Sequence, residues 1–340
     1  PVDRRQRQMC IRDSNKIKDE EYKEFYRHVS SDFTDPLSWS HNKVEGKQDY
    51  TSLIYIPSMA PMDLYHRDAS RGIKLYIKRT FIMDDAEQFL PMYLRFVKGV
   101  LDSADLPLNI SREILQKTPL VESIKSALTK RVLDMLSKLA KKDQEKYATF
   151  WSQFGTVLKE GPSEDHTNKE KIAKLFLFSS SSMNDEKPTV TLEGYVSRMK
   201  EKQKKIYYVT GDSISSLRNS PYLEAFKKHN IEVLLMHDRI DEWMMGYLTE
   251  FDGKQFQDIA KGELDLDEIT DSSGEEKKTA KKKDSKSDEK VISKIGDILD
   301  NRVSGVRTTS RLTHSPACLV VGEHDICLLY TSDAADDQLG

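Results

Sequence analysis

The sequence predicts an α/β protein with two α/β units, and three patterns in its 340 residues support this prediction. Apolar and polar residues alternate over 73–78, which is the period of a half-buried strand. Apolar residues recur at helical spacing over 120–139 and indicate an amphipathic helix. Two apolar runs, 206–209 and 231–236, flank a helical pattern at 214–228. Segments of these lengths predict two parallel strands joined by a right-handed crossover.

The other elements of the first unit follow from the same two periods. Residues 22–29 predict a short amphipathic helix, and residues 49–56, which end at Pro57, predict a strand. Residues 89–101 carry apolar side chains at helical spacing. We therefore expect a helix there, with Pro91 in its first turns.

A helical connector is expected next. Pro119 should begin the helix of the 120–139 stripe, because proline is favoured in the first helical turn. Residues 147–158 form an aromatic stripe that ends at Gly161 and Pro162. Such a stripe belongs to a protein core far more often than to a cofactor site, so we assign it to the core.

The second unit contains further predicted helices at 169–178, 192–199 and 241–251, the last of which presents Trp243. Residues 210–213, Thr-Gly-Asp-Ser, lie at the strand-to-helix turn where nucleotide-binding folds hold phosphate. They lack the glycine-rich patterns of those folds, so we interpret them as a turn and a helix N-cap.

The chain also contains segments that should not join either unit. Residues 272–290 are too highly charged to bury a core, and acids flank their lysine run, so they predict a linker instead of a nucleic-acid site. Both ends differ in pattern from their neighbours, and we expect them to be foreign sequence. The predicted divisions are a foreign tail at 1–14, a large α/β unit at 15–118, the helical connector at 119–168, a small α/β unit at 169–265, a charged disordered linker at 266–290, the truncated start of another domain at 291–326 and a foreign tail at 327–340.

Composition argues against several classes of function. The net charge of −3 supplies no field for nucleic acid or an anionic membrane, and no apolar run approaches the roughly 18–20 residues that span a bilayer. The three cysteines lie near the chain ends, and the eight histidines form no cluster with metal-ligand spacing. No nucleophile motif or carboxylate pair is present. We therefore expect a cytoplasmic protein with no metal site, and a self-contained enzyme is not supported.

One arginine is unusual for its position. Arg112 follows Pro107, Asn109 and Ser111, which predict an extended segment that turns into a helix. A cation at a helix N-terminus is unfavourable by roughly 0.3–1 kcal/mol unless an anion meets it. Arg112 and Gln116 share a helix face and can offer a guanidinium and an amide to a phosphate. The alternative is an ordinary surface arginine.

Six motifs, in order along the chain, resemble those of the 90-kDa heat-shock chaperones, and in particular of their bacterial branch. They are EYKEFY at 21–26, IKLYIKRTFI at 73–82, FVKGVLDS at 96–103, LPLNISRE at 106–113, IYYVTG at 206–211 and YLTEFDGK at 247–254. The resemblance implies the family's middle segment, with its ribosomal-S5-like architecture. In that architecture a larger α/β/α sandwich and a smaller Rossmann-like unit are joined by a helical connector.

The resemblance also implies a role for the unusual arginine. In the family, ATP and Mg²⁺ bind to an N-terminal domain, which we expect to lie outside these residues. The arginine of the LPLNxSRE motif contacts the ATP γ-phosphate, and Arg112 matches it. Asn109 and Gln116 match its polar neighbours. The full-length protein is then an ATPase and a chaperone, and this chain by itself should not hydrolyse ATP.

Three further positions match family contacts. Phe81 matches an apolar residue that packs toward the N-terminal domain, and Glu242 and Trp243 match positions linked to client proteins. Trp243 beside Met244 and Met245 would suit a surface that tolerates varied partners. The alternatives are that Phe81 is buried in its own domain and that the Trp243 helix packs within its own unit.

The implied partners are the protein's own N-terminal ATPase domain, unfolded or partly folded clients, and a second copy bound through the C-terminal domain. Nucleic acid and membranes are not expected as partners. Two other functions were considered. One is ATP-independent binding of unfolded proteins, and the other is a small-molecule enzyme, for which no polar constellation is present.

Overall fold

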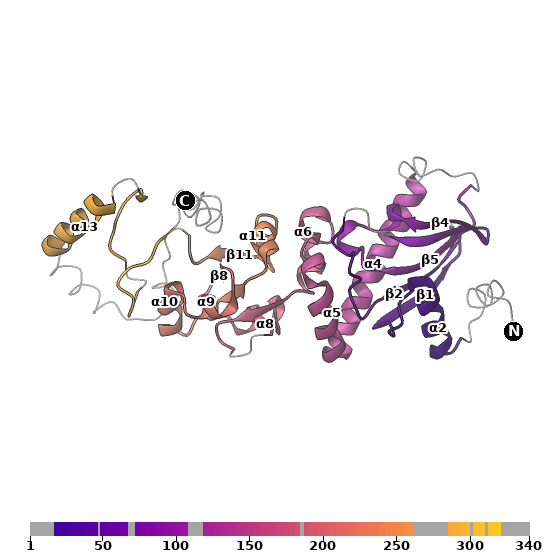
Figure 1. The fold of residues 1–340 in the computed structure, drawn as a ribbon, viewed down its shortest axis with the longest axis horizontal. Coiled ribbons are helices and arrows are strands. Elements are labelled where there is room, and N and C mark those ends of the chain that lie inside the picture. The colour runs from indigo at the N-terminus through magenta and orange to yellow at the C-terminus, as the bar shows by residue number, and fades with distance from the viewer. Residues whose placement is uncertain are drawn as a thin grey trace. The chain divides into compact units, whose positions relative to one another are not determined.

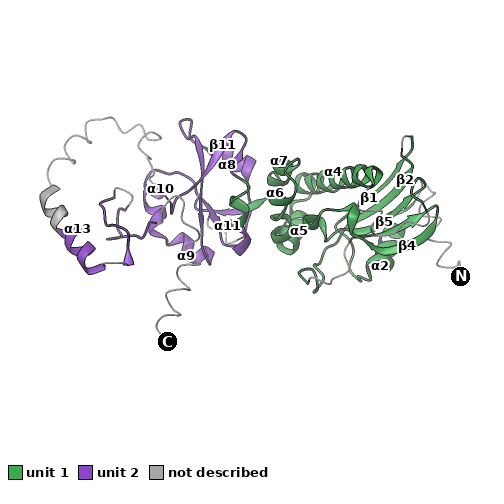
Figure 2. Cartoon of the chain, turned by 90° about the horizontal axis from the view of Figure 1, so that it is seen from above, with its two compact units in different colours: residues 1–177, 243–248 green, residues 178–242, 249–340 purple. Residues whose placement is uncertain are grey.

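The computed structural model describes residues 17–46, 48–66, 72–107, 118–183, 187–261, 285–299, 302–309 and 312–320. The chain divides into two compact units (Figure 2): unit 1 contains residues 1–177 and 243–248, and unit 2 contains residues 178–242 and 249–340. Each unit is built on a mixed β-sheet with helices, so the predicted α/β class and the presence of two units are confirmed. The finer divisions predicted above stay predictions.

Unit 1 contains a sheet of five described strands in the order β1-β2-β5-β3-β4 (Figure 1). The strands are β1 (Ser38–Val44), β2 (Tyr50–Ile56), β3 (Ile73–Ile77), β4 (Thr80–Ala86) and β5 (Lys98–Ser103). β3 and β5 run parallel, and the other neighbouring pairs are antiparallel. The strands predicted at 49–56 and 73–78 are confirmed as β2 and β3, whereas β1 and β4 were not predicted.

Helices cover both faces of this sheet. α2 (Asp19–Ser30) confirms the helix predicted at 22–29, and its Tyr26 is fully buried against Leu53, Tyr55 and Tyr76. Side chains alternate along a strand, so Leu75 faces away from α2, and it is also fully buried. Figure 2 shows α2 and α4 (Pro119–Lys142) on opposite sides of the sheet. The core of unit 1 therefore has two layers.

The helix predicted at 89–101 is wrong. The segment forms two 3-10 turns, η1 (Glu87–Phe89) and η2 (Met92–Leu94), and then the strand β5. β5 lies in the middle of the sheet, and its two apolar side chains, Val100 and Leu101, are adjacent, so the strand has no alternation that distinguishes it from a helix. Gly99 has no side chain, and this lets the backbone of β2 approach β5 closely.

The connector is helical, as predicted. α4 begins at Pro119, and α5 (Gln144–Leu158) carries the aromatic stripe. Its aromatic members are buried, which confirms that the stripe is core: Tyr147, Phe150, Trp151 and Phe154 are all less than 9% exposed. α6 (Gly161–Glu164) and α7 (Lys169–Ala173) complete the segment. The helix predicted at 169–178 ends at residue 173.

A buried ion pair joins this connector to the turn at η2. The Arg95 guanidinium donates to both carboxylate oxygens of Glu160, at 2.5 and 2.8 Å, and to the carbonyl oxygens of Leu64 and Met92. The Arg95 side chain is 7% exposed. Because four bonds satisfy the guanidinium, burying its charge is tolerated.

Unit 2 contains a sheet of six described strands in the order β10-β11-β8-β9-β6-β7. These strands are β6 (Leu177–Ser180), β7 (Val190–Thr191), β8 (Lys205–Thr210), β9 (Leu234–Met236), β10 (Glu250–Phe251) and β11 (Lys254–Asp258). β8 and β9 are parallel, which confirms the predicted pair. Ser213 caps the following helix with its hydroxyl, so residues 210–213 are a turn and an N-cap, as predicted.

Its helices are α8 (Leu192–Arg198), α9 (Ile214–Arg218), η3 (Pro221–Leu223), α10 (Glu224–Lys228), α11 (Arg239–Met245) and α13 (Ser285–Leu299). The helix predicted at 214–228 is divided at Pro221, since proline lacks an N–H and disfavours helical backbone in the residue before it. The helix predicted at 241–251 ends at Met245 and is followed by β10. α13 begins inside the predicted linker; residues 266–284 of that linker lie outside the described residues.

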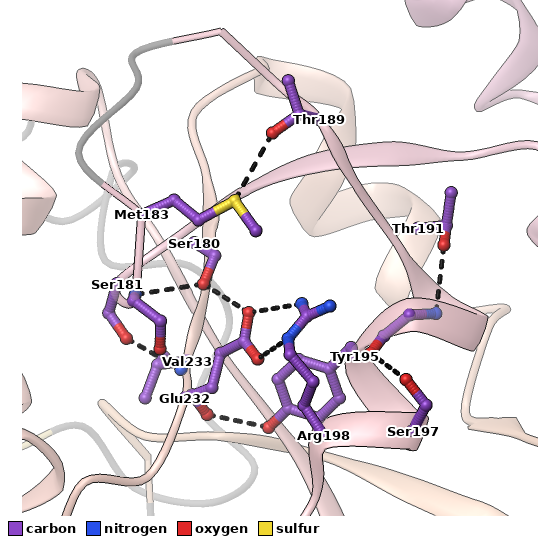
Figure 3. A network of polar contacts seen from close by, with 12 residues as sticks. Ser180, Ser181, Met183, Thr189, Thr191, Tyr195, Ser197, Arg198, Glu232 and Val233 are labelled. Carbon is purple, nitrogen blue, oxygen red and sulfur yellow. Dashed lines mark hydrogen bonds and ion pairs between the residues drawn. The ribbon is translucent and has the colours of Figure 1, made fainter. Parts of the chain in front are cut away.

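A network of hydrogen bonds connects β6 and α8 to Glu232 (Figure 3). Ser180 on β6 and Arg198 on α8 both donate to the carboxylate of Glu232, at 2.6 Å from Ser180 and at 2.8 and 3.0 Å from Arg198. The Tyr195 hydroxyl donates to the Glu232 carbonyl and accepts from the backbone N–H of Tyr207. Burial raises the pKa of Tyr195, so the hydroxyl keeps its proton. The network has a structural role.

Candidate functional site

The first candidate site lies at one edge of the unit 1 sheet. Parallel strands β3 and β5 pair Ile77 with Ser103, so both strands end at this edge. The chain leaves β3 through Lys78 and Arg79 and leaves β5 toward the segment that contains Arg112.

Lys78 and Arg79 form an unusual turn at this edge. Ile77 pairs with Thr80, so the turn has two residues, and their φ angles are 49° and 68°. Left-handed backbone costs roughly 1–2 kcal/mol for each residue that is not glycine, which is why asparagine and glycine normally occupy such turns. The N–H of Lys78 donates to the Ser103 carbonyl at 3.1 Å, and that of Arg79 to the Asp102 carboxylate at 3.2 Å.

Two cations are thus held at the sheet edge despite backbone strain. Neither cation was predicted from the sequence, because a turn with neither asparagine nor glycine gives no local signal. Strain of this kind is often retained at functional sites.

The described residues on either side of 108–117 have defined contacts. Ala104 N–H donates to the Asp49 carbonyl at 2.9 Å, and Asp49 N–H donates to the Asp105 carboxylate at 2.7 Å. Leu106 is 1% exposed, and Pro119 begins α4 at the far end. The predicted site residues Asn109, Arg112 and Gln116 lie outside the described residues, because residues 108–117 are not described.

A pocket of about 670 Å³ lies beside this edge. Its charged lining comes from the β1–β2 hairpin, the β3–β4 turn and β5: Lys43, Glu45, Asp49, Lys78, Arg79 and Asp102. The three cations and three carboxylates balance, so the lining by itself does not favour an anion. The pocket suits a polar protein surface, and any net positive charge at the edge must come from outside it.

Phe81 lies on β4, the edge strand next to this turn. Its side chain is 49% exposed, and its ring meets Tyr76 edge to face at a centroid distance of 5.5 Å. The alternative that Phe81 is buried within its own domain is therefore wrong. An aromatic ring held by one neighbour and open to solvent is available to a partner.

The second candidate site is an aromatic pair at the end of α11. Trp243 is 47% exposed and Tyr247 41% exposed, and their rings meet edge to face with centroids 5.0 Å apart. Lys169 donates to the Tyr247 carbonyl at 3.3 Å, which fixes the turn after the helix. The pair belongs to unit 1 and combines apolar surface with two polar ring groups.

The methionines do not join this surface. Met244 is 0% and Met245 8% exposed, so the expected surface of Trp243 beside two methionines is wrong. Successive residues on a helix point about 100° apart, and the two methionines point into the core. The exposed surface at this site is therefore formed by Trp243 and Tyr247.

Glu242 belongs to unit 2 and is half-buried. Burial raises the pKa of Asp258, and the negative charge of Glu242 contributes to that rise. The charge of Glu242 therefore interacts with the Asp258 carboxylate of the same unit, which indicates a structural role for Glu242. In the part of the chain that the structure describes, no group of side chains could hold a metal ion, and no helix combines the length and apolarity needed to cross a bilayer.

Comparison with known proteins identifies the family. The sequence model of the Hsp90 protein family matches residues 4–328. The chain belongs to the Hsp90 family. The match begins within the segment that we expected to be foreign sequence.

Curated relatives and a solved structure agree with this assignment. The chain is 59% identical over 309 residues to proteins named chaperone protein HtpG from Salmonella typhimurium and Salmonella typhi, and the aligned region covers 91% of this chain. The chain spans about half the length of these relatives, 49%. It also resembles the solved middle domain of a putative heat shock protein from Plasmodium falciparum, with 32% identity and a TM-score of 0.66. That match covers 74% of this chain and 98% of the other, which supports the two-unit architecture.

Proposed function

We propose that this chain is the middle part of an ATP-dependent molecular chaperone that assists the folding of client proteins. Membership of the Hsp90 family and 59% identity to HtpG chaperones carry the proposal. The match of Arg112 to the family motif supports a phosphate contact, and the exposed Trp243–Tyr247 pair supports a client contact.

Arg112 is the residue proposed to act on the nucleotide. When ATP and Mg²⁺ are bound, they supply the phosphoryl group and part of its charge neutralisation, and the N-terminal domain holds them. The chain's own contribution is a guanidinium, whose planar donors match phosphate oxygens and stabilise the charge that develops on them. Asn109 and Gln116 are proposed to orient it. The charges that line the pocket at this edge balance, so the proposed phosphate contact rests on Arg112 itself.

Phe81 is proposed to pack against the N-terminal domain when that contact forms. It lies on β4, directly after the Lys78–Arg79 turn, and is exposed. Burial of this ring stabilises the closed arrangement in which Arg112 reaches the phosphate.

The test for Arg112 uses the full-length protein. Arg112→Ala should reduce the rate of ATP turnover at least roughly tenfold, because arginines in phosphoryl transfer contribute at least this much. The dissociation constant for ATP should change much less, since the nucleotide is held elsewhere. Lys130→Ala removes an exposed cation from α4 and is the matched control. Unchanged turnover in the Arg112 variant would rule out the assigned role.

The client surface is tested separately. A disordered client protein is titrated against the Trp243→Ala variant, and Val291→Ala serves as the control because it removes an exposed apolar side chain from α13. We expect weaker binding for Trp243→Ala alone. An equal affinity for wild type and the Trp243 variant would contradict the assignment of this surface.

The same experiment separates the two chaperone functions. If Trp243→Ala weakens client binding and Arg112→Ala changes neither turnover nor client release, the chain acts as an ATP-independent binding module. Dimerisation through the C-terminal part and a cytoplasmic location belong to the proposed function and rest on the family alone.

A further inference from the structure

Glu224 occupies a fixed position on the surface of unit 2. It is the first residue of α10 and is half-buried. The residues on either side are core: Leu223 is 0% and Ala225 5% exposed, and both pack in the main cluster of the unit. The packing of these two neighbours in the core therefore fixes the backbone position of Glu224.

Three successive backbone N–H groups donate to this carboxylate. The N–H groups of Thr313 and His314 lie 2.6 and 2.8 Å from Oε2, and that of Ser315 lies 3.1 Å from Oε1. The hydroxyls of Thr313 and Ser315 also donate to it. Successive N–H groups that converge in this way form an anion-binding concavity. Bonds to an ionised acceptor are roughly twice as strong as neutral ones.

The protonation state of Glu224 agrees with this geometry. The N–H of His314, the hydroxyl of Ser315 and the N–H of Thr313 lower the pKa of Glu224 to about 2. The carboxylate is therefore ionised at neutral pH and accepts all of these bonds.

A second contact lies a few residues further along. The Tyr222 hydroxyl donates to the carbonyl of Leu319, and the Tyr222 ring packs against the unit 2 core. The Leu319 side chain itself is 61% exposed. The polar contacts to η3 and α10 therefore involve both ends of the segment, residues 313–315 and Leu319.

We propose that Glu224 holds residues 312–320 against the surface that η3 and α10 form in unit 2. The segment follows α13 in the sequence, more than eighty residues after Glu224, yet it lies against the surface that η3 and α10 form. The docking uses the main chain of residues 313–315, so it depends on the path of the backbone there and not on the His314 side chain. It is independent of the proposed nucleotide and client contacts.

Hydrogen–deuterium exchange of the whole chain, read at residues 312–320, tests the proposal. In Glu224→Ala, the amides of Thr313, His314 and Ser315 should exchange at least about tenfold faster than in wild type. Glu224→Gln should give a smaller increase, because its amide oxygen still accepts but carries no full charge. Glu201→Gln changes an exposed acid of the same unit and should have no effect. Unchanged amides in β8 and β9 show that each variant is folded.

Variants on the other side of the contact give an independent test. His314→Ala keeps the N–H and should leave the exchange of residues 313–315 unchanged. His314→Pro removes that N–H and should raise the exchange at residues 313 and 315 to the level of Glu224→Ala. The proposal is overturned if Glu224→Ala leaves the three amides protected, or if His314→Ala exposes them as strongly as His314→Pro.

Discussion

Gly99 offers the sharpest test of how unit 1 is built. It lies on β5 within the FVKGVLDS motif, opposite Ile54 of β2, and its φ is +155°. A Cβ atom at this position would lie 2.2 Å from the carbonyl oxygen of Leu53 and 2.9 Å from the Cα of Ile54. Both are backbone atoms, so no side-chain rotation relieves the contact, and β2 must move away from β5.

The expected cost of Gly99→Ala follows from this geometry. Backbone strain at an unfavourable φ costs about 1–3 kcal/mol, and overpacking in a tight interior costs about the same again. We expect unit 1 to lose about 2–6 kcal/mol of unfolding free energy, against a total of about 5–15 kcal/mol for a typical domain. β5 also leads into the segment with Arg112, so its displacement should disturb the proposed phosphate contact.

Tryptophan fluorescence during urea unfolding measures this loss in unit 1 specifically. All three tryptophans of the sequence, Trp39, Trp151 and Trp243, belong to that unit. Gly46→Ala is the matched control: its φ is +131°, but a Cβ there meets no atom within 4 Å, so it should cost only the backbone strain of about 1–3 kcal/mol without the overpacking. A Gly99→Ala midpoint equal to that of Gly46→Ala would refute the argument from close approach.

Two further predictions concern stability. Arg95→Ala should cost unit 1 up to about 3 kcal/mol in the same urea assay, because the half-buried Glu160 carboxylate, whose side chain is 26% exposed, loses its guanidinium partner. Arg95→Met with Glu160→Leu should recover most of this loss, and an equal loss in the double variant would contradict the prediction. Burial lowers the pKa of His41, whose ring accepts or donates a 3.0 Å hydrogen bond with Tyr22. The native state thus favours neutral His41, so its contribution is present above the unfolded pKa of about 6.5 and is lost as pH falls below it. The melting temperature measured between about pH 8 and pH 5 should fall less steeply for His41→Gln than for wild type, and identical slopes would exclude His41 as the cause.

Local patterns determined several elements without tertiary information. Alternation identified β3, helical spacing identified α2 and α5, and Pro119 marked the start of α4. These signals are reliable because the buried apolar side chains recur at the period of the element: Phe25, Tyr26 and Val29 at helical spacing in α2, and Ile73, Leu75 and Ile77 at alternate positions in β3. The parallel pair of β8 and β9 followed from strand and helix lengths alone.

The tertiary structure decided what these periods do not encode. Residues 98–103 became a central strand because β2 and β3 flank them, and their two adjacent apolar residues, Val100 and Leu101, show no strand period. Phe81 and Trp243 stay exposed, while Met244, next in sequence, is buried. Arg112 was recognised by its motif, but the strained cations at Lys78 and Arg79 became visible only through the pairing of Ile77 with Thr80. Local spacing sets which residues share a face, whereas the pairing of distant strands sets which faces are covered and which charges meet.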